Sequence, residues 1–425
     1  MTQKFTLQIH PMEAPHPQFI IRIIIYSKEC LKICLMELML IFLAQEPVTP
    51  RDSAIMWTAV AKDYMLKENY EKVIENTRRA LKHDSTYTTA YLIMAKAFLH
   101  MDMPDSAISI YELMVKKFPD KPEGYQGLGY VYGVIKKEYD KAIEYYKKAL
   151  ELDPTNEDIL FGLAKVYEEA GKPGEARTLY EALIKKYPEE LKFYIAYAKF
   201  LYEIGDYKAA SDIIEKAYQM DSTNVDIWKL GYKINGDYYK KLKKENPESP
   251  DVVKYAKRTI KYLEKLYEKE PDNFKYAYDL ADAYVVAGMG KKAIALLKKL
   301  AEQKNHSSIY IKLGYVYNEH LRDLTNAEKM YKKALELAKQ EGSAKNISFI
   351  YVNLGDIYYD RATALRKKKK YCKAYKVYDT AIAYYNKALT EGEIPSESLK
   401  RYVLKKKEVT KKYRQIAWRK CNNID

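Results

Sequence analysis

Histidine and cysteine are the residues in this sequence best suited to hold a metal or act as nucleophiles, but their spacing favours neither role. The six histidines form no HExxH motif and no pair spaced i, i+4. The four cysteines, Cys30, Cys34, Cys372 and Cys421, form no CxxC pair. We therefore expect no metal site and no disulfide framework, and we interpret the cysteines as isolated thiols without a joint role.

Motifs for phosphate binding and catalysis are also missing from the sequence. There is no P-loop, and Gly124, Gly127 and Gly129 do not have the spacing of a dinucleotide-binding loop. Serine, histidine and aspartate cannot be grouped into a triad from the sequence alone. We predict a protein that is not an enzyme and that needs no cofactor.

A repeat of about 34 residues organises most of the chain. A small residue recurs near the start of one helical segment, and most successive copies are 34 or 35 residues apart. The residues at this position are Val73, Ala107, Ala142, Ala176, Ala210, Thr259, Ala293, Ala327 and Ala381. Such a period is typical of stacked pairs of helices.

A second helical pattern precedes these segments. It consists of an aromatic residue, then Leu-Gly or an equivalent pair, then a tyrosine, as in Tyr125, Leu128, Gly129 and Tyr132. The i, i+3, i+4, i+7 spacing places these side chains on one face of a helix. The small residue after leucine allows a second helix to approach closely. We therefore interpret much of the chain's tyrosine, 43 residues in all, as core.

These two segments together resemble the tetratricopeptide repeat (TPR) family over about residues 54 to 391, where nine repeats can be counted. The resemblance implies an all-α, right-handed superhelical solenoid whose concave face is lined by the first helix of each repeat. We expect a leader and linker over residues 1–50, the solenoid over 51–391 and a basic capping helix over 392–425. Extra residues stretch two repeats, near 235–258 and 360–380, and the first helix of the former should extend to about Lys244.

Residues 1–50 do not match the repeat. From Lys28 to Ala44, basic residues are followed by an apolar run, which is typical of a signal peptide. Charged residues interrupt the wider apolar stretch too often to favour a transmembrane helix. Two interpretations stay open: export or membrane attachment through this leader, a wrongly assigned start included, or a cytoplasmic protein with an N-terminal capping helix.

One position on the first helix of the repeats suggests a binding surface for a partner protein. It lies directly after the small residue and is occupied by Lys62, Lys96, Tyr130, Lys165, Lys199 and Lys233 in the first six repeats. If it faces the concave groove, the lysines would attract an acidic partner segment. Solvated surface lysines are the alternative.

Two further features of this position define the expected partner. Later repeats carry Asp282, Tyr315 and Asp356 there, so we expect the groove to become more acidic. The asparagines with which chaperone-binding TPR domains hold a C-terminal carboxylate are absent, which disfavours that partner.

Nearly all of the net charge lies near the C-terminus. The chain carries +15, and residues 361–420 hold 19 Lys and Arg against 5 Asp and Glu, a net charge of +14. The densest runs are Arg366, Lys367, Lys368, Lys369 and Lys370, and Lys405, Lys406 and Lys407. Such a patch would suit an anionic membrane or an acidic protein, and less so nucleic acid; a solubilising cap is the alternative.

Two hypotheses about function follow from these observations. The first is a non-catalytic scaffold that binds a partner protein in the groove. The second is an adaptor that associates with nucleic acid or an anionic membrane through the basic C-terminal region.

Overall fold

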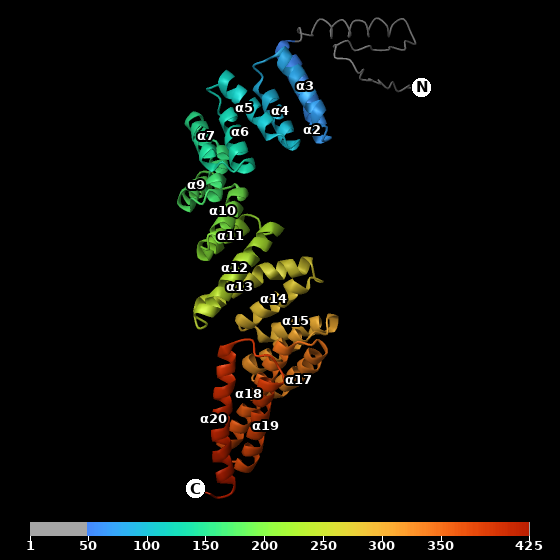
Figure 1. Cartoon of the computed structure of the whole chain (residues 1–425), viewed down its shortest axis with the longest axis vertical. Helices are drawn as coiled ribbons and strands as arrows, with labels where there is room; N and C mark the ends of the chain where they lie inside the picture. The colour runs from blue at the N-terminus through green and yellow to red at the C-terminus, as the bar shows by residue number, and fades with distance from the viewer. Residues whose placement is uncertain (1–48, 425) are drawn as a thin grey trace, which may run out of the picture. The chain divides into compact units, whose positions relative to one another are not determined.

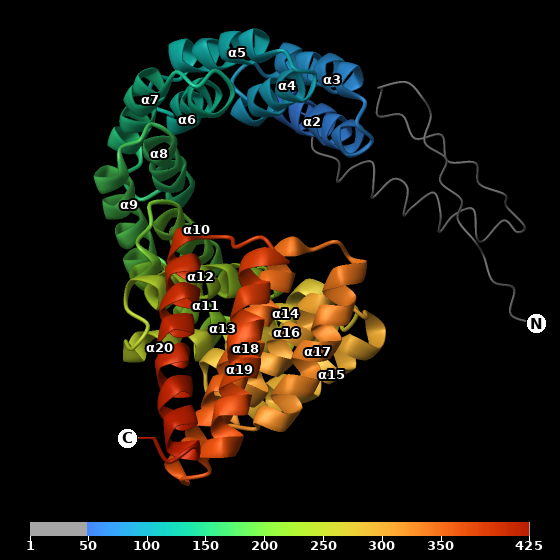
Figure 2. The same cartoon turned by 60° about the horizontal axis from the view of Figure 1, so that its bottom comes forward.

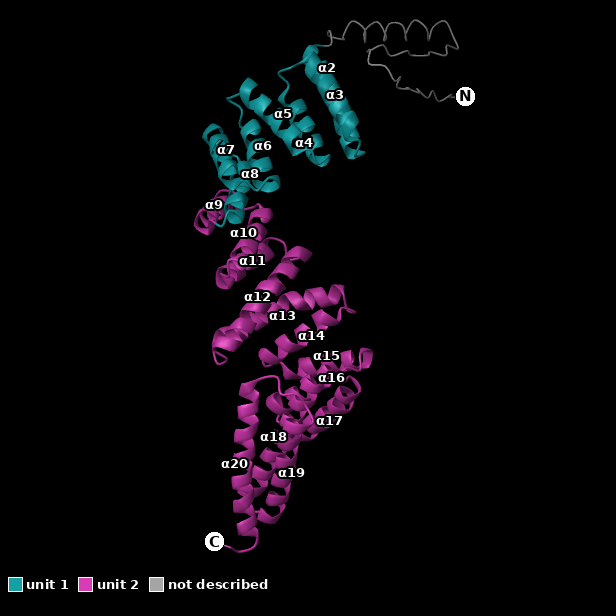
Figure 3. Cartoon of the chain, viewed as in Figure 1, with its two compact units in different colours: residues 1–171 teal, residues 172–425 magenta. Residues whose placement is uncertain are grey.

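The computed structural model describes residues 49–424, and all regular elements in this range are helices (Figure 1). The chain divides into two compact units between Gly171 and Lys172 (Figure 3). In each unit, helices that follow one another along the chain pack against each other. The fold is an all-α helical-repeat solenoid, as the sequence predicts.

The first unit contains alternating first and second helices of the repeats. Its elements are α2 (Pro50–Leu66), α3 (Tyr70–His83), α4 (Thr88–His100), α5 (Pro104–Lys117), α6 (Pro122–Tyr130), the π-helical turn η1 (Val131–Ile135), α7 (Tyr139–Leu152) and α8 (Glu157–Glu169). The first helices are α2, α4, α6 and α8; α2 contacts α4, and α6 contacts α8.

The second unit continues the same alternation. Its elements are α9 (Pro173–Lys186), α10 (Leu191–Glu203), α11 (Tyr207–Met220), α12 (Val225–Glu245), α13 (Pro250–Lys269), α14 (Phe274–Val286), α15 (Gly290–Gln303), α16 (Ser307–Tyr315), η2 (Val316–His320), α17 (Leu324–Gln340), α18 (Ala344–Lys367), α19 (Tyr371–Thr390) and α20 (Glu397–Cys421). Here α10, α12, α14, α16 and α18 are the first helices of their repeats.

The small residue of the first helix makes room for a buried tyrosine of the second helix. A Cβ atom placed on Gly129 would lie 2.7 Å from the ring of Tyr146, and one placed on Gly355 would lie 2.6 Å from the ring of Tyr385. Both rings are almost fully buried. Glycine therefore sits where the backbone must touch an aromatic ring, which explains the pairing of Leu-Gly with a tyrosine stripe.

One residue with positive φ recurs in the turn between the two helices of most repeats. The turn positions are Glu68, Asp102, Lys137, Gly171, Gly205, Gly288, Arg322 and Lys369. The left-handed conformation ends the first helix and turns the chain towards the second. The residue with positive φ therefore stands at the same place in each of these repeats.

The extra residues of the two stretched repeats lengthen their helices. Helix α12 extends to Glu245, close to the predicted Lys244, and α13 begins at Pro250. In the later stretched repeat, α18 has 24 residues and α19 has 20. Each extension has a small core of its own, and the core of the latter includes Ala362, Ala374, Tyr378 and Ala417.

Helix α20 covers the end of the repeats. Ser396 caps it by accepting a hydrogen bond from the backbone N–H of Leu399 at 3.2 Å. Val403, Thr410 and Ala417 are buried at intervals of seven residues, and α20 packs beside α19 (Figure 2). The solenoid thus ends on a helix whose exposed side is mostly polar, with Tyr402, Leu404 and Trp418 as the exposed large apolar residues.

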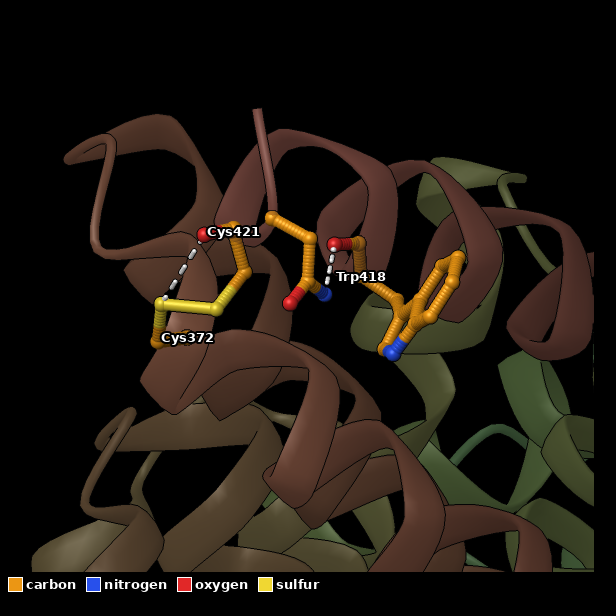
Figure 4. Close-up of a disulfide and its surroundings, with 4 residues drawn as sticks. Cys372, Trp418 and Cys421 are labelled. Atoms are coloured by element: carbon orange, nitrogen blue, oxygen red, sulfur yellow. Dashed lines mark hydrogen bonds between the residues drawn. A yellow bond between two sulfur atoms is a disulfide. The ribbon is translucent and has the colours of Figure 1, made fainter. Parts of the chain in front are cut away.

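The interpretation of Cys372 and Cys421 as isolated thiols is wrong. The two residues form a disulfide between the start of α19 and the end of α20 (Figure 4). They are 49 residues apart in sequence, and the antiparallel packing of the two helices brings them together. Cys30 and Cys34 lie outside the described residues.

The predicted leader over residues 1–50 lies almost entirely outside the described residues, so the signal-peptide and anchor interpretations stay predictions. Between residues 49 and 424, no helix combines the length and apolar character needed to cross a bilayer.

Candidate protein-interaction surfaces

The six predicted groove residues lie at equivalent places on the first helices of the two units. In the first unit these are Lys62 on α2, Lys96 on α4, Tyr130 on α6 and Lys165 on α8. In the second unit, Lys199 lies on α10 and Lys233 on α12, which contact each other. Because the repeats share one register, equivalent positions face the same side of each unit.

In the first unit this face combines cationic and apolar groups. Lys62 and Lys96 are exposed, and neither forms an ion pair with another described residue. One helical turn after Lys62 stands Leu66, whose side chain is 86% exposed. One turn after Tyr130, which is 43% exposed, stands Val134, which is 50% exposed. The face therefore offers apolar contact as well as positive charge.

The later lysines of the row differ from the first two because they already have partners. Lys165 pairs with Glu168 at 3.0 Å and Lys199 with Glu203 at 3.7 Å. The ammonium group of Lys233 lies 4.8 Å from the ring centroid of Tyr202. Glu168 and Glu203 stand three and four positions after their lysines, a spacing at which side chains meet on a helix surface, so these pairs could be read from the sequence. The lysines at this repeat position therefore do not all carry a free positive charge.

The acidic residues at this position in later repeats bind neighbouring helices. Asp282 accepts a hydrogen bond from Tyr239 at 3.1 Å and pairs with Lys312 at 2.5 Å. Burial opposes ionisation of Asp282, but the charge and hydrogen bond of Lys312 outweigh it and lower the pKa of the carboxyl group. Tyr315 is 37% exposed.

Asp356 holds the last repeat to the capping helix. It accepts hydrogen bonds from Tyr385 at 2.7 Å and from Tyr402 of α20 at 2.9 Å. Lys406 of α20 pairs with it at 3.3 Å. The carboxylates of this part of the row thus stabilise the junction between helices.

Tyrosine–carboxylate hydrogen bonds between repeats are a feature that the sequence analysis missed. Tyr202 on α10 donates to Asp237 on α12 at 2.6 Å, and Tyr232 on α12 donates to Asp279 on α14. Burial comes first among the causes that raise the pKa of Tyr232 well above its usual value, followed by its hydrogen bond to Asp279. These two tyrosines therefore join one repeat to the next through their hydroxyl groups.

The two basic runs near the C-terminus occupy different places. Lys367, Lys368, Lys369 and Lys370 are all exposed at the end of α18 and in the turn to α19. The guanidinium group of Arg366 lies 4.4 Å from the ring centroid of Tyr413. The run formed by Lys405, Lys406 and Lys407 lies within α20, where only Lys405 is exposed and the other two are half-buried. Lys406 is directed to Asp356, so the two runs do not make one patch.

Two features of the described residues bear on metal binding and small-molecule binding. Among them, no three His, Cys, Asp or Glu side chains gather closely enough to hold a metal ion. An open hollow of the first unit lies between α3 and the end of α4, and apolar Ile74, Phe98, Met101 and Met103 line it together with charged side chains of α3. Its lining offers neither a hydroxyl nor a thiol nucleophile.

The fold and these surfaces define a helical-repeat protein with binding faces, and comparison with known proteins gives its family. Models described as tetratricopeptide repeat match residues 89–121, 134–200, 169–230, 256–313 and 307–341. The chain belongs to the tetratricopeptide-repeat family. Repeats of this family support the role of a protein-interaction scaffold, and the fold is typically non-catalytic.

Three relatives illustrate the range of proteins that the chain resembles. It is 24% identical over 266 residues to the Protein CTR9 homolog of Arabidopsis thaliana, covering 55% of this chain and 24% of that protein. It is 26% identical over 130 residues to Hsp70-Hsp90 organizing protein 2 of Arabidopsis thaliana, covering 31% of this chain and 21% of that protein. It is 27% identical over 181 residues to Protein O-mannosyl-transferase TMTC3 of Homo sapiens, covering 41% of this chain and 20% of that protein. The chain thus spans only about a fifth to a quarter of the length of these relatives.

Solved structures of repeat proteins are also similar. The pilF protein of Pseudomonas aeruginosa is 18% identical, with 48% of this chain and 97% of that chain covered and a TM-score of 0.39. YrrB, described as a TPR protein with an unusual peptide-binding site, is 18% identical, with 47% of this chain and 95% of that chain covered and a TM-score of 0.35.

Proposed function

We propose that this chain is a non-catalytic scaffold that binds an acidic segment of a partner protein on the face formed by the first helices of its repeats. The observation that carries the proposal is the pair of exposed lysines, Lys62 and Lys96, on adjacent first helices of one unit. Neither lysine is neutralised by a described carboxylate. Tyr130 and Lys165 occupy the same position in the other repeats of this unit and would contribute less positive charge. Lys199 and Lys233 occupy it in the second unit.

Apolar contact adds to the charge attraction. An exposed ion pair stabilises a complex by only about 0–1 kcal/mol. Full burial of a leucine side chain contributes roughly 1.5–3 kcal/mol, and Leu66 is almost fully exposed in the free chain. We therefore expect the partner segment to carry leucine-like side chains among its acidic residues.

The partner segment should lie within a chain and not at a free C-terminus. The relative named Hsp70-Hsp90 organizing protein invites comparison with carboxylate-clamp domains. One turn before Lys62 stands Thr58, which is buried and donates its hydroxyl hydrogen to the Ala54 carbonyl at 2.7 Å. One turn before Lys96 stands Leu92. Neither side chain offers the amide with which such a clamp holds a carboxylate.

The test uses full-length protein and synthetic peptides of defined charge. Three peptides of equal length would combine leucine with glutamate, leucine with glutamine, and alanine with glutamate, and binding would be followed by fluorescence anisotropy. We expect the first to bind most tightly and its affinity to fall as salt is raised.

A matched pair of charge reversals locates the site. K62E/K96E should weaken binding of the leucine–glutamate peptide by about tenfold or more. K199E/K233E makes the same change in net charge at lysines that already have partners and should weaken it less. Equal losses in the two variants, or none in K62E/K96E when it folds normally, would contradict the proposal.

We also infer a second surface that attracts polyanions, formed by the exposed basic residues Lys367 to Lys370. None of the four forms an ion pair with a described residue. The adaptor hypothesis for the C-terminal region rests on this run and not on Lys405–Lys407. Retention of the full-length protein on heparin at low salt, and its loss in the variant K367Q/K368Q/K369Q/K370Q, would test it.

A further inference from the structure

The far end of the α18–α20 group forms a basic surface without acidic residues. We call it the basic tip and define it as the exposed residues Lys367, Lys368, Lys369, Lys370, Lys373, Arg419 and Lys420. No Asp or Glu occurs between residues 361 and 378 or between 409 and 424. The next acidic residue, Asp425, lies outside the described residues. No cation of the tip forms an ion pair with a described residue.

The disulfide assembles the tip from two distant segments. Cys372 lies two residues after Lys370, and Cys421 follows Arg419 and Lys420, so their covalent bond joins the two groups of cations (Figure 4). Below them, Ala374, Tyr378 and Ala417 form a small core that α18, α19 and α20 build by themselves. The tip is therefore held in one arrangement by a cross-link and by packing.

The basic side chains that face the helices differ from those that face solvent. Arg366 lies over Tyr413, and Arg414 pairs with Asp379 at 2.9 Å. The seven cations of the tip lie in the turn or at helix ends, and all of them except Arg419 are lysines. Lysine is a flexible point charge that suits a diffuse anionic surface, whereas arginine is preferred where a phosphate or base is held in fixed geometry.

An exposed tryptophan lies beside these cations. Trp418 is in the last turn of α20, its side chain is 40% exposed, and its indole points away from the disulfide (Figure 4). Tryptophan is enriched at the boundary between membrane and water, where its ring inserts among lipid headgroups. Solvent exposure leaves this ring available for such contact.

We propose that the basic tip docks on a membrane surface rich in anionic phospholipid, with Trp418 inserted at the headgroup level. The inference rests on the second surface proposed above and names its partner. The tip is the end of a helical group and not a groove, so it can touch a flat anionic surface with many lysines at once. A single-stranded nucleic acid would instead need a groove with stacking platforms.

Binding of full-length protein to sedimented vesicles tests the proposal. Vesicles of phosphatidylcholine alone would be compared with vesicles containing about a third phosphatidylserine. We expect binding to the anionic vesicles only, with loss at about 0.5 M salt. Each lysine near an anionic surface strengthens binding about fivefold, so K367Q/K368Q/K369Q/K370Q should bind roughly several hundred-fold more weakly at low salt.

A matched variant controls for net charge. K244Q/K257Q/K291Q/K298Q removes four exposed lysines of the same unit outside the tip and should bind almost as the unmodified chain does. Trp418 provides a spectroscopic signal, because Trp57 is buried and Trp228 is partly buried. Vesicles should shift the tryptophan emission to shorter wavelength, and W418F should abolish the shift.

The outcomes separate the inference from the surface on which it rests. Retention on heparin or RNA without vesicle binding would leave the polyanion surface standing and overturn the lipid inference. Loss of both would overturn the two together. Vesicle binding that K367Q/K368Q/K369Q/K370Q does not weaken would also overturn the proposal, because another part of the chain would then carry it.

Discussion

Replacing Gly355 by alanine should destabilise the last repeat, although alanine is the better helix former. A Cβ atom at this position would lie 2.6 Å from Cε1 and 2.8 Å from Cδ1 of Tyr385. The ring has no room to move, because Tyr385 is fully buried and its hydroxyl donates to Asp356 at 2.7 Å. The new methyl group must therefore displace α18 from α19.

Two opposing contributions decide whether Gly355→Ala raises or lowers the free energy of unfolding. Alanine in place of glycine within a helix favours the folded state by roughly 0.5–1 kcal/mol. Overpacking of a well-filled core costs about 1–3 kcal/mol. We expect Gly355→Ala to lower the free energy of unfolding by about 0.5–2 kcal/mol.

Gly236 provides a matched control within a helix of the same unit. It is buried in α12, but a Cβ atom there would lie 3.7 Å from its nearest neighbours, Thr259 and Tyr232, which is ordinary contact. Gly236→Ala should therefore raise the free energy of unfolding by roughly 0.5–1 kcal/mol.

Urea unfolding followed by circular dichroism measures both variants, and hydrogen exchange locates the change. The amides of α18 and α19 should exchange faster in Gly355→Ala than in the unmodified chain, because repeats unfold partly on their own. A Gly355→Ala variant as stable as the unmodified chain, or two variants that shift in the same direction, would refute the assignment of glycine to close ring contact.

Two further predictions concern the same end of the chain. Burial opposes ionisation of Glu328, but hydrogen bonds from Lys332, Tyr358 and Arg361 outweigh it and lower the pKa of the carboxyl group from 4.5 to about 2. The lowered pKa stabilises the folded state at pH values above the pKa of the unfolded chain, and this stabilisation is lost as pH falls towards 2. Glu328→Gln should therefore lower the free energy of unfolding by about 1–2 kcal/mol at neutral pH and by much less near about pH 2.5. Urea unfolding at both pH values measures the difference. Reducing the disulfide Cys372–Cys421, which spans 49 residues, removes a cross-link worth about 4 kcal/mol on the chain-entropy model. We expect faster hydrogen exchange in the last turns of α20, and unchanged exchange would mean that packing of Tyr413 and Ala417 alone holds them.

The architecture could be predicted from the sequence because the information that sets it is local. The 34-residue period, the Leu-Gly pair and the small residue of the second helix each act within one pair of helices, whose members are close in sequence. The lengthening of α12 is equally local, since it depends on an unbroken run of helix formers. Periodicity therefore determined the repeat, its register and the close approach at Gly129 and Gly355.

Which charged side chains have partners depends in part on contacts between helices, and the 34-residue period does not reveal these contacts. The pairing of Lys165 and Lys199 with acidic neighbours was readable at helix spacing, yet the pairing of Lys406 with Asp356 joins residues of different helices. The hydrogen bonds from Tyr202 to Asp237 and from Tyr232 to Asp279 likewise cross from one repeat to the next, 35 and 47 residues along the chain.

Cys372 and Cys421 show the limit most clearly. Their separation of 49 residues carries no signal of its own, because a disulfide depends on the distance between two backbones in the folded chain. Only the antiparallel packing of α19 and α20 determines that the start of one helix meets the end of the other. The sequence by itself determined the repeated helix pair, and the tertiary structure decided which charges remain exposed and which distant residues meet.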